Sequence, residues 1–171
     1  YITGGAWKKI GDTSNPNIGN TILYPDNYFI IRNNSTVTRS TVFRNIGEVE
    51  LQSMTIPLAS LTGGKQDNFI GLPRPVDVGL SDLGLDDVSF VNSASALSRK
   101  DELLVFNNAV AGKNKSASAT YYRLSGNLWR KVGGGTADHN NTVISAGAGF
   151  IIRKAATTLG GTSMWQNTAP Y

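Results

Sequence analysis

The 171-residue sequence has no cysteine, little charge and no long apolar run. The lack of cysteine excludes disulfide bonds, iron–sulfur clusters, thiolate zinc sites and cysteine nucleophiles. Charged residues make up only 16% of the chain, against a typical value of about 25%. No apolar stretch approaches the roughly 20 residues that a membrane-spanning helix needs. We therefore expect a core held by packing alone and no insertion into a membrane.

Uncharged polar residues take the place of the missing charges. The chain has 16 Asn, 15 Ser, 15 Thr and 19 Gly, together 65 of its 171 residues, which is typical of a β-rich protein with many turns. Hydrophobic residues still make up 40% of the chain, enough for a folded core. The net charge of +4 comes from basic residues that are scattered along the sequence, so no nucleic-acid partner is predicted.

The chain also lacks the short motifs of common catalytic and cofactor sites. It contains no H-E-x-x-H, Walker A, G-x-G-x-x-G or G-x-S-x-G pattern. Its one histidine, His139, follows Asp138. An Asp beside a His is compatible with an oriented base, but no serine nucleophile can be assigned to it, and a structural or exposed loop histidine is the more common case. We expect a protein that is not an enzyme and that holds no cofactor or metal ion.

Two groups of oxygen-bearing side chains have alternative interpretations. Asp86 and Asp87 could form the acid pair of a glycoside hydrolase, although adjacent residues of a strand point to opposite faces and a solvated turn fits them better. Asp12, Asn15 and Asn17 could supply oxygens to a calcium ion, but they do not follow the EF-hand pattern. Capping of tight turns by their side chains is the simpler interpretation.

An internal repeat is the strongest signal in the sequence. A first repeat copy (residues 3–32) resembles a second repeat copy (residues 125–153), with an offset of 122 residues between Trp7 and Trp129 and of 121 residues from Asn20 onward. Ten residues of the first copy recur identically: Gly4, Trp7, Lys9, Gly11, Asn20, Thr21, Phe29, Ile30, Ile31 and Arg32. We interpret the two copies as a duplicated supersecondary unit.

Each copy is predicted to form three short strands, because β-branched and aromatic residues gather between turn signals. In the first copy these strands lie at residues 6–10, 21–24 and 28–32. Other predicted strands lie at residues 36–43, 47–55, 103–106 and 119–124. Helical signals are limited to a short turn within residues 80–87 and to residues 93–104, where Ser98 is a candidate N-cap.

These elements predict an all-β protein. We expect two related antiparallel β-units that form a sandwich or barrel-like core with little helix. The predicted boundaries are residues 1–60 for the first β-unit, 61–100 for a connecting region with a short helix or turns, and 101–171 for the second β-unit. Both units are expected to pack around one shared core.

The first repeat copy has less polypeptide before it than the second. Residues 103–106 predict a strand beside the second copy, whereas the first copy begins near Tyr1 with no equivalent strand. A sheet edge without a partner recruits a strand from elsewhere, and a strand from a neighbouring subunit would make a head-to-tail contact that generates a filament. The alternative is a sequence cut short before Tyr1. Residues 162–167 are a candidate donor strand. The expected subunit interface contains Tyr1, Ile2, Trp7, Ile10, Met164 and Trp165.

The repeated tryptophans have two interpretations. In an ideal strand, Trp7 shares a face with Lys9, so both faces of the segment carry apolar and basic groups. An exposed tryptophan beside polar residues would be a stacking platform for sugars, and Trp7 and Trp129 are then the glycan-binding residues. Packing of each tryptophan in the core of its repeat is the more common arrangement.

Several segments together resemble a known family. They are residues 103–108, 112–122, 129–133, 147–153 and 165–167, with the Trp, basic residue, Lys, Ile or Val, Gly motif and the Phe-Ile-Ile-Arg motif at their centre. These segments are similar to an uncharacterised paralogous family of secreted proteins, best known from bacteria of the verrucomicrobial group. The resemblance covers essentially the whole chain, and members of the family usually carry a further N-terminal portion with a secretion signal. The resemblance implies secretion and a surface or matrix role, and it assigns no catalytic residue.

The sequence therefore favours an extracellular or cell-surface structural protein that assembles with itself, as a filament or surface-layer subunit, through strand complementation. The alternative is a carbohydrate-binding or adhesive module of the cell surface. The expected partners are other copies of the chain and, for the alternative, a surface polysaccharide.

Overall fold

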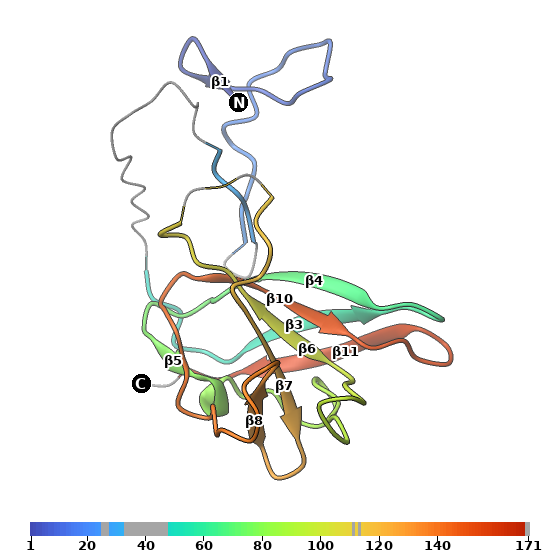
Figure 1. The fold of residues 1–171 in the computed structure, drawn as a ribbon. Helices are drawn as coiled ribbons and strands as arrows, with labels where there is room; N and C mark the ends of the chain where they lie inside the picture. Colours follow the sequence, from blue (N-terminus) through green and yellow to red (C-terminus); the bar gives the residue numbers. More distant parts are fainter. Residues whose placement is uncertain (25–27, 33–47, 111, 113, 170–171) are drawn as a thin grey trace.

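The protein is all-β, as the sequence predicts. The computed structural model describes residues 1–24, 28–32, 48–110, 112 and 114–169 (Figure 1). Within these residues there are eleven strands, whose seven pairings are all antiparallel, and one short 3₁₀ turn, η1 (Leu80–Asp82). The helix expected within residues 93–104 is absent: residues 94–98 form bends, in which the Ser95 hydroxyl accepts from the backbone of Leu97 and Ser98, and residues 102–104 belong to a strand.

The largest element is a five-stranded antiparallel sheet. Its strand order is β4-β10-β6-β7-β8. The strands are β4 (Gln66–Gly71), β6 (Glu102–Val105), β7 (Ala119–Leu124), β8 (Leu128–Lys131) and β10 (Gly149–Lys154). The predictions at residues 103–106 and 119–124 correspond to β6 and β7. The central strand β10 carries the Phe-Ile-Ile-Arg motif, and it is hydrogen-bonded to β4 on one side and to β6 on the other.

A second pair of strands forms a separate two-stranded sheet beside this one. β3 (Met54–Ser60) pairs with β11 (Gly161–Asn167) over seven residues. The side chain of Asn68, on β4, bridges the two sheets: its amide accepts from the backbone N–H of Ala59 at 2.8 Å and donates to the carbonyl of Ala59 at 3.0 Å. The β11–β3 pair and the five-stranded sheet thus remain separate ladders joined by the Asn68 side chain, and the described residues form no closed barrel.

The core is formed by residues of these strands and of the segment around residues 80–90. A short pair, β5 (Val78–Gly79) with β9 (Val143–Ile144), and η1 close one end of it. The buried residues include two tryptophans, which make two aromatic contacts: Trp129 with Phe90 at 5.0 Å and Trp165 with Phe150 at 6.4 Å between ring centroids. The core consists of Ile56, Leu58, Ile70, Leu72, Val78, Leu80, Leu83, Leu85, Phe90, Leu103, Tyr121, Trp129, Ile144, Phe150, Ile152 and Trp165.

This core does not include the first repeat copy. Every residue of the core cluster lies between Ile56 and Trp165, and none comes from the first repeat copy. The predicted first unit (residues 1–60) contributes Ile56 and Leu58 to this core, but its repeat copy contributes no residue to it. We call residues 54–169 the main β-domain.

The predicted domain boundaries change for the same reason. Strand β3 lies within the predicted first unit (residues 1–60), but it pairs with β11 near the C-terminus. The predicted connecting region (residues 61–100) supplies β4, β5 and Phe90, so it is part of the core rather than a linker. Local sequence patterns could not identify these pairings, because the partners are about 100 residues apart.

The first repeat copy forms only a small hairpin. β1 (Ile2–Thr3) pairs with β2 (Ala6–Trp7) across a turn in which Gly4 and Gly5 both have positive φ. Two central residues with positive φ are the signature of a type I′ turn, which glycine adopts without strain. Figure 1 shows this hairpin standing apart from the main β-domain.

The other strands predicted for this part of the chain are absent or lie outside the described residues. Residues 21–24 and 28–32 have no strand structure. The strand predicted at 36–43 lies outside the described residues, and the one predicted at 47–55 overlaps β3 only at Met54 and Thr55.

The two repeated tryptophans offer a matched test of this fold. Trp129 is fully buried, so Trp129→Ala is expected to lower the free energy of unfolding of the main β-domain by about 3–5 kcal/mol through the lost contacts and the cavity. Trp7 is 54% exposed, so Trp7→Ala is expected to change the same free energy by no more than about 0.5 kcal/mol. Urea unfolding followed by circular dichroism measures both. Equal losses in the two variants would contradict the assignment of Trp7 to a surface.

Candidate interaction surface

The two repeat copies have the same loop structure. In the second copy, the His139 N–H donates to the carbonyl of Trp129 at 3.1 Å, and in the first copy Ile18 donates to Trp7 at 3.0 Å. The next turn recurs as well, with Thr142 donating to the carbonyl of His139 and Thr21 to that of Ile18, both at 3.0 Å. The duplication proposed from the sequence therefore has a structural counterpart in its backbone hydrogen bonds.

Side-chain capping also recurs in this loop. The Asn17 carboxamide accepts from the backbone of Gly19 at 3.0 Å, and the Asp138 carboxylate accepts from Asn140 at 2.7 Å. Asp12 accepts from both the backbone and the hydroxyl of Ser14, which lowers the pKa of Asp12 below its ordinary value. Asp12 and Asn17, two of the three candidate calcium ligands, thus serve as turn caps. The described residues contain no group of three acidic, His or Cys side chains that could hold a metal ion.

The two copies differ sharply in what covers them. Trp7 is 54% exposed and Trp129 is fully buried; Leu23 is 62% exposed, whereas its counterpart Ile144 is 1% exposed. The difference also holds for Ile30 and Ile31 against the buried Ile151 and Ile152, whereas Val143, the counterpart of Ile22, is itself exposed. We call the exposed set the apolar face of the first repeat copy: Trp7, Ile10, Ile22, Leu23, Ile30 and Ile31.

In the main β-domain, other segments of the chain cover the second repeat copy. Phe90 packs on Trp129, and Val78 on β5 pairs with Ile144. Strands β4 and β6 flank β10 and so bury the second Phe-Ile-Ile-Arg motif. All four of these covering elements come from residues 54–120, which we call the front segment. The first repeat copy has no front segment of its own among the described residues.

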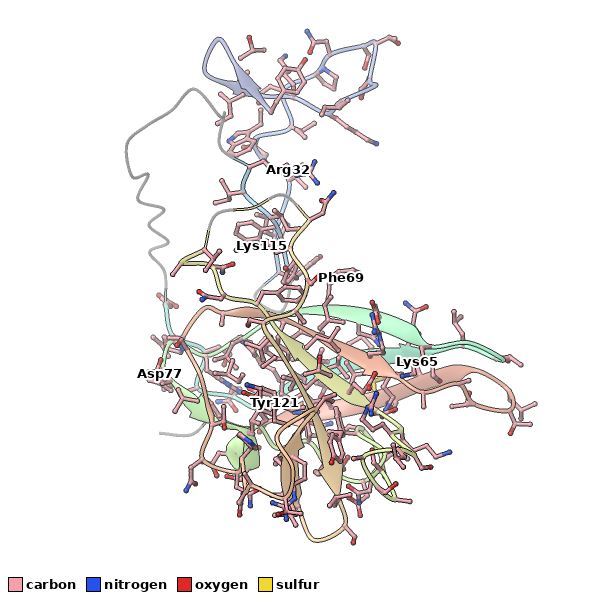
Figure 2. All side chains as sticks on the ribbon, viewed as in Figure 1. Arg32, Lys65, Phe69, Asp77, Lys115 and Tyr121 are labelled. Atoms are coloured by element: carbon pink, nitrogen blue, oxygen red, sulfur yellow. The ribbon has the colours of Figure 1, made fainter. Side chains whose placement is uncertain are left out.

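The first repeat copy touches the main β-domain through Tyr28. Its ring lies 5.6 Å from the ring of Phe69, and it covers Gly149 so closely that a Cβ there would come within 2.4 Å of a Tyr28 ring carbon. Nearby, the Arg32 guanidinium donates to the side chain of Asn114 at 3.2 Å. Figure 2 shows Arg32 and Phe69 on the side of the main β-domain that faces the N-terminal hairpin.

The residues predicted for a subunit interface lie in different surroundings. Tyr1, Ile2, Trp7 and Ile10 are exposed around the hairpin, and Met164 is exposed on β11. Trp165 is fully buried, and its indole N–H donates to the carbonyl of Leu83 at 2.8 Å. It therefore has no surface to offer a second subunit. Likewise, residues 162–167 are not a loose donor strand, because they already pair with β3.

The glycan-binding prediction does not hold for Trp129. This side chain lies in the core against Phe90, and its indole N–H has no hydrogen-bond partner among the described residues. A fully buried ring cannot stack on a sugar. Of the two repeated tryptophans, Trp7 alone has an exposed ring.

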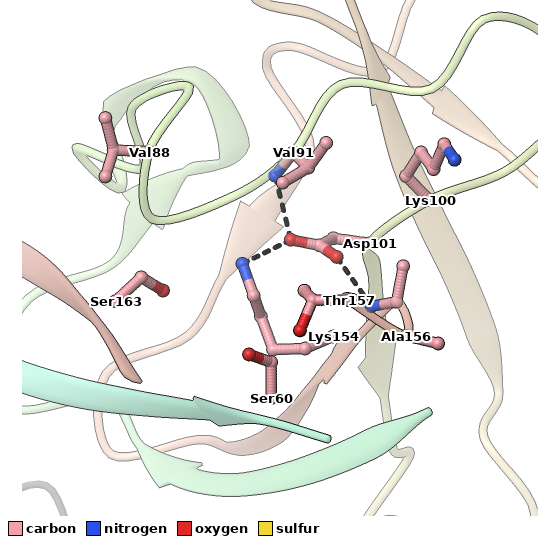
Figure 3. Close-up of a pocket in the computed structure, with 10 residues that line it drawn as sticks. Ser60, Val88, Val91, Lys100, Asp101, Lys154, Ala156, Thr157 and Ser163 are labelled. Atoms are coloured by element: carbon pink, nitrogen blue, oxygen red, sulfur yellow. Dashed lines mark hydrogen bonds and ion pairs between the residues drawn. The ribbon is translucent and has the colours of Figure 1, made fainter. Parts of the chain in front are cut away.

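One hollow of the main β-domain is built around an ion pair (Figure 3). It has a volume of about 210 Å³ and contains Asp101 and Lys154 in its wall. The Asp101 carboxylate accepts from the Lys154 ammonium and from the backbone N–H groups of Val91 at 2.8 Å and Ala155 at 2.7 Å. The Lys154 ammonium also donates to the carbonyl of Ser89 at 2.6 Å. With their polar atoms engaged in this way, the pair is suited to fixing the start of β6 against the end of β10.

The other candidate catalytic groups are engaged in separate structural contacts. Asp86 caps the turn to Ser89, whose hydrogen bonds lower the pKa of Asp86. Asp87 pairs instead with the buried Arg123 at 2.7 Å. The two carboxylates thus have different partners, in agreement with the turn interpretation. His139 is half-buried, with its Nδ1 3.2 Å from the Thr142 hydroxyl and its ring edge-on to Tyr121.

Comparisons with protein-family models, with curated proteins and with solved structures find no match to this chain. Among the described residues, no helix is long and apolar enough to cross a membrane.

The contact at Gly149 gives a prediction about how the first repeat copy rests on the main β-domain. Gly149→Ala is expected to displace Tyr28, because the added methyl group would overlap its ring. Gly64→Ala is the matched control, since a Cβ at Gly64 meets nothing within 4 Å. In NMR spectra, the Tyr28 and Phe69 ring signals should shift with the Gly149 variant and stay in place with the control. Unchanged ring signals in Gly149→Ala would contradict this contact.

Proposed function

We propose that the protein is an extracellular structural subunit that assembles with copies of itself. In this assembly, the apolar face of the first repeat copy of one molecule is covered by β-structure of the next. The role is structural rather than catalytic, and it requires no cofactor.

One observation carries the proposal: the same repeated sequence is buried in one copy and exposed in the other. Ile31 is 54% exposed, and its counterpart Ile152 is fully buried between two strands. Exposed apolar surface of this extent marks an interaction site more often than a solvated one, especially where it is rimmed by polar residues. Because the second copy is covered by strands, β-polypeptide is the natural cover for the first.

The contacts of the candidate catalytic carboxylates support assembly over catalysis. The carboxylates that could have served as acids or bases hold turns and ion pairs in the main β-domain. The location outside the cell rests on the composition, which is poor in charge and rich in Asn, Ser, Thr and Gly, and on the resemblance to secreted proteins.

The direct test is the concentration dependence of size. The wild-type chain is expected to form larger species as its concentration rises, and Ile31→Asp is expected to remain monomeric because a charge would be buried in the contact. Sedimentation velocity measures both.

A matched control removes an exposed apolar side chain elsewhere. Leu97 is 99% exposed in the main β-domain, so Leu97→Asp should assemble like the wild type. If the wild type stays monodisperse at high concentration, or if the Ile31 and Leu97 variants behave alike, the proposed function is wrong.

A carbohydrate-binding role is the second candidate, and the exposure of Trp7 favours it. Exposed aromatic rings stack on sugars, and the polar side chain of Asn17 accepts from the Trp7 backbone N–H at 3.1 Å. Binding to a polysaccharide that is lost in Trp7→Ala, with the main β-domain still folded, would support it. The equivalence of Trp7 with the core residue Trp129 favours the assembly role instead.

A further inference from the structure

The ion pair of Lys154 with Asp101 is the most deeply buried among the described residues. Its two side chains are 4% and 1% exposed, whereas each of the other ion pairs has at least one side chain that is 32% exposed or more. Two opposite charges that are taken out of water lose their hydration, and their mutual attraction often repays only part of that loss. An amide bond between the two groups would remove both buried charges.

The fold holds both groups in a fixed position. The Lys154 ammonium donates to the Asp101 carboxylate and to the carbonyl of Ser89 at 2.6 Å. The carboxylate also accepts from the backbone N–H groups of Val91 and Ala155, which fix its orientation. Figure 3 shows the two side chains pointing toward each other. Groups that a fold holds in contact react far more readily than the same groups in free solution.

The backbone places the two residues on neighbouring strands. β10 pairs antiparallel with β6, and the last pair of this ladder joins Arg153 to Glu102. Continuing the register by one residue puts Lys154 opposite Asp101, although the two are 53 residues apart in the sequence. A bond between directly opposed residues links two strands that already lie side by side, so it requires no rearrangement of the sheet.

We propose that Lys154 Nζ and Asp101 Cγ are joined by an amide bond. This inference concerns the main β-domain alone and does not rest on the proposed function. One proton moves from the ammonium to Oδ2 along the existing hydrogen bond, which leaves a neutral amine beside a carboxylic acid. The amine attacks Cγ and forms the Nζ–Cγ bond. A second proton passes from Nζ to Oδ2, the Cγ–Oδ2 bond breaks, and the oxygen leaves as one water molecule.

The surroundings of the pair suit this step. The N–H of Ala155 donates to Oδ1 of Asp101, where negative charge develops during the attack, and it therefore stabilises the intermediate. The hollow that both side chains border has a volume of about 210 Å³. A water molecule occupies roughly 30 Å³, so the released water has room to leave. Ser60, Thr157 and Ser163 also line the hollow, and their hydroxyl oxygens can accept from that water.

Mass spectrometry of the denatured full chain tests the bond directly. The wild type is expected to be about 18 Da lighter than its sequence, because the reaction releases one water molecule. Lys154→Arg is expected to have the full mass of its sequence. A guanidinium keeps the positive charge of the pair but stays protonated, so it does not attack the carboxyl group.

A tryptic digest of the same protein locates the bond. Trypsin does not cut after an acylated lysine, so residues 101–113 should appear joined to residues 154–171 in one branched peptide. Lys65 is the internal control, because it forms an ion pair with Glu102 at 2.9 Å but its side chain is 47% exposed. Trypsin should cut completely after Lys65.

Two results would overturn this inference. The first is a wild-type chain of full sequence mass that trypsin cuts after Lys154, since the two groups then form an ion pair only. The second is a loss of one water molecule with Lys154 still cut, since the water then comes from another group, such as an aspartate that has closed to a cyclic imide. Neither result bears on the proposed function, because the bond lies within one chain.

Discussion

The burial of one strand between two others is the constraint on which this structure depends. Strand β10 is hydrogen-bonded on both sides and buries Phe150 and Ile152 completely. The same four residues occur again at 29–32, where Ile30 and Ile31 remain exposed. A strand gains its stability from neighbours rather than from its own sequence, so identical segments can be a core in one place and a surface in another.

The contrast between the copies also separates local hydrogen bonds from burial by distant segments of the chain. The recurring loop hydrogen bonds are local, and each copy makes them by itself. The burial of Trp129 and Ile144 depends instead on the front segment. The first repeat copy thus forms the same loop hydrogen bonds, but no described segment covers its apolar side chains as the front segment covers those of the second copy. This arrangement supports the proposed assembly role, because Trp7, Leu23 and Ile31 are exposed whereas their counterparts Trp129, Ile144 and Ile152 are buried.

The sequence predicts some of these features and not others for identifiable reasons. The repeat, the all-β class and strands β6 and β7 follow from local patterns of β-branched and aromatic residues. The strands predicted at 21–24 and 28–32 did not form, because strand propensity alone does not supply a partner. The burial of Trp165 was missed since it depends on pairing with β3, about 100 residues away. The bridge through Asn68 and the contact of Tyr28 with Gly149 have no local signal, because each joins groups that only the folded chain brings together.

Amide hydrogen exchange at Ile30 and Ile31 tests most directly whether a second copy of the chain covers the apolar face of the first repeat copy. We expect fast exchange of both amides in dilute solution and clear protection as the protein concentration rises, while the counterparts Ile151 and Ile152 stay protected throughout. Fast exchange of Ile30 and Ile31 at every concentration would contradict it, as would protection that is already complete in the monomer.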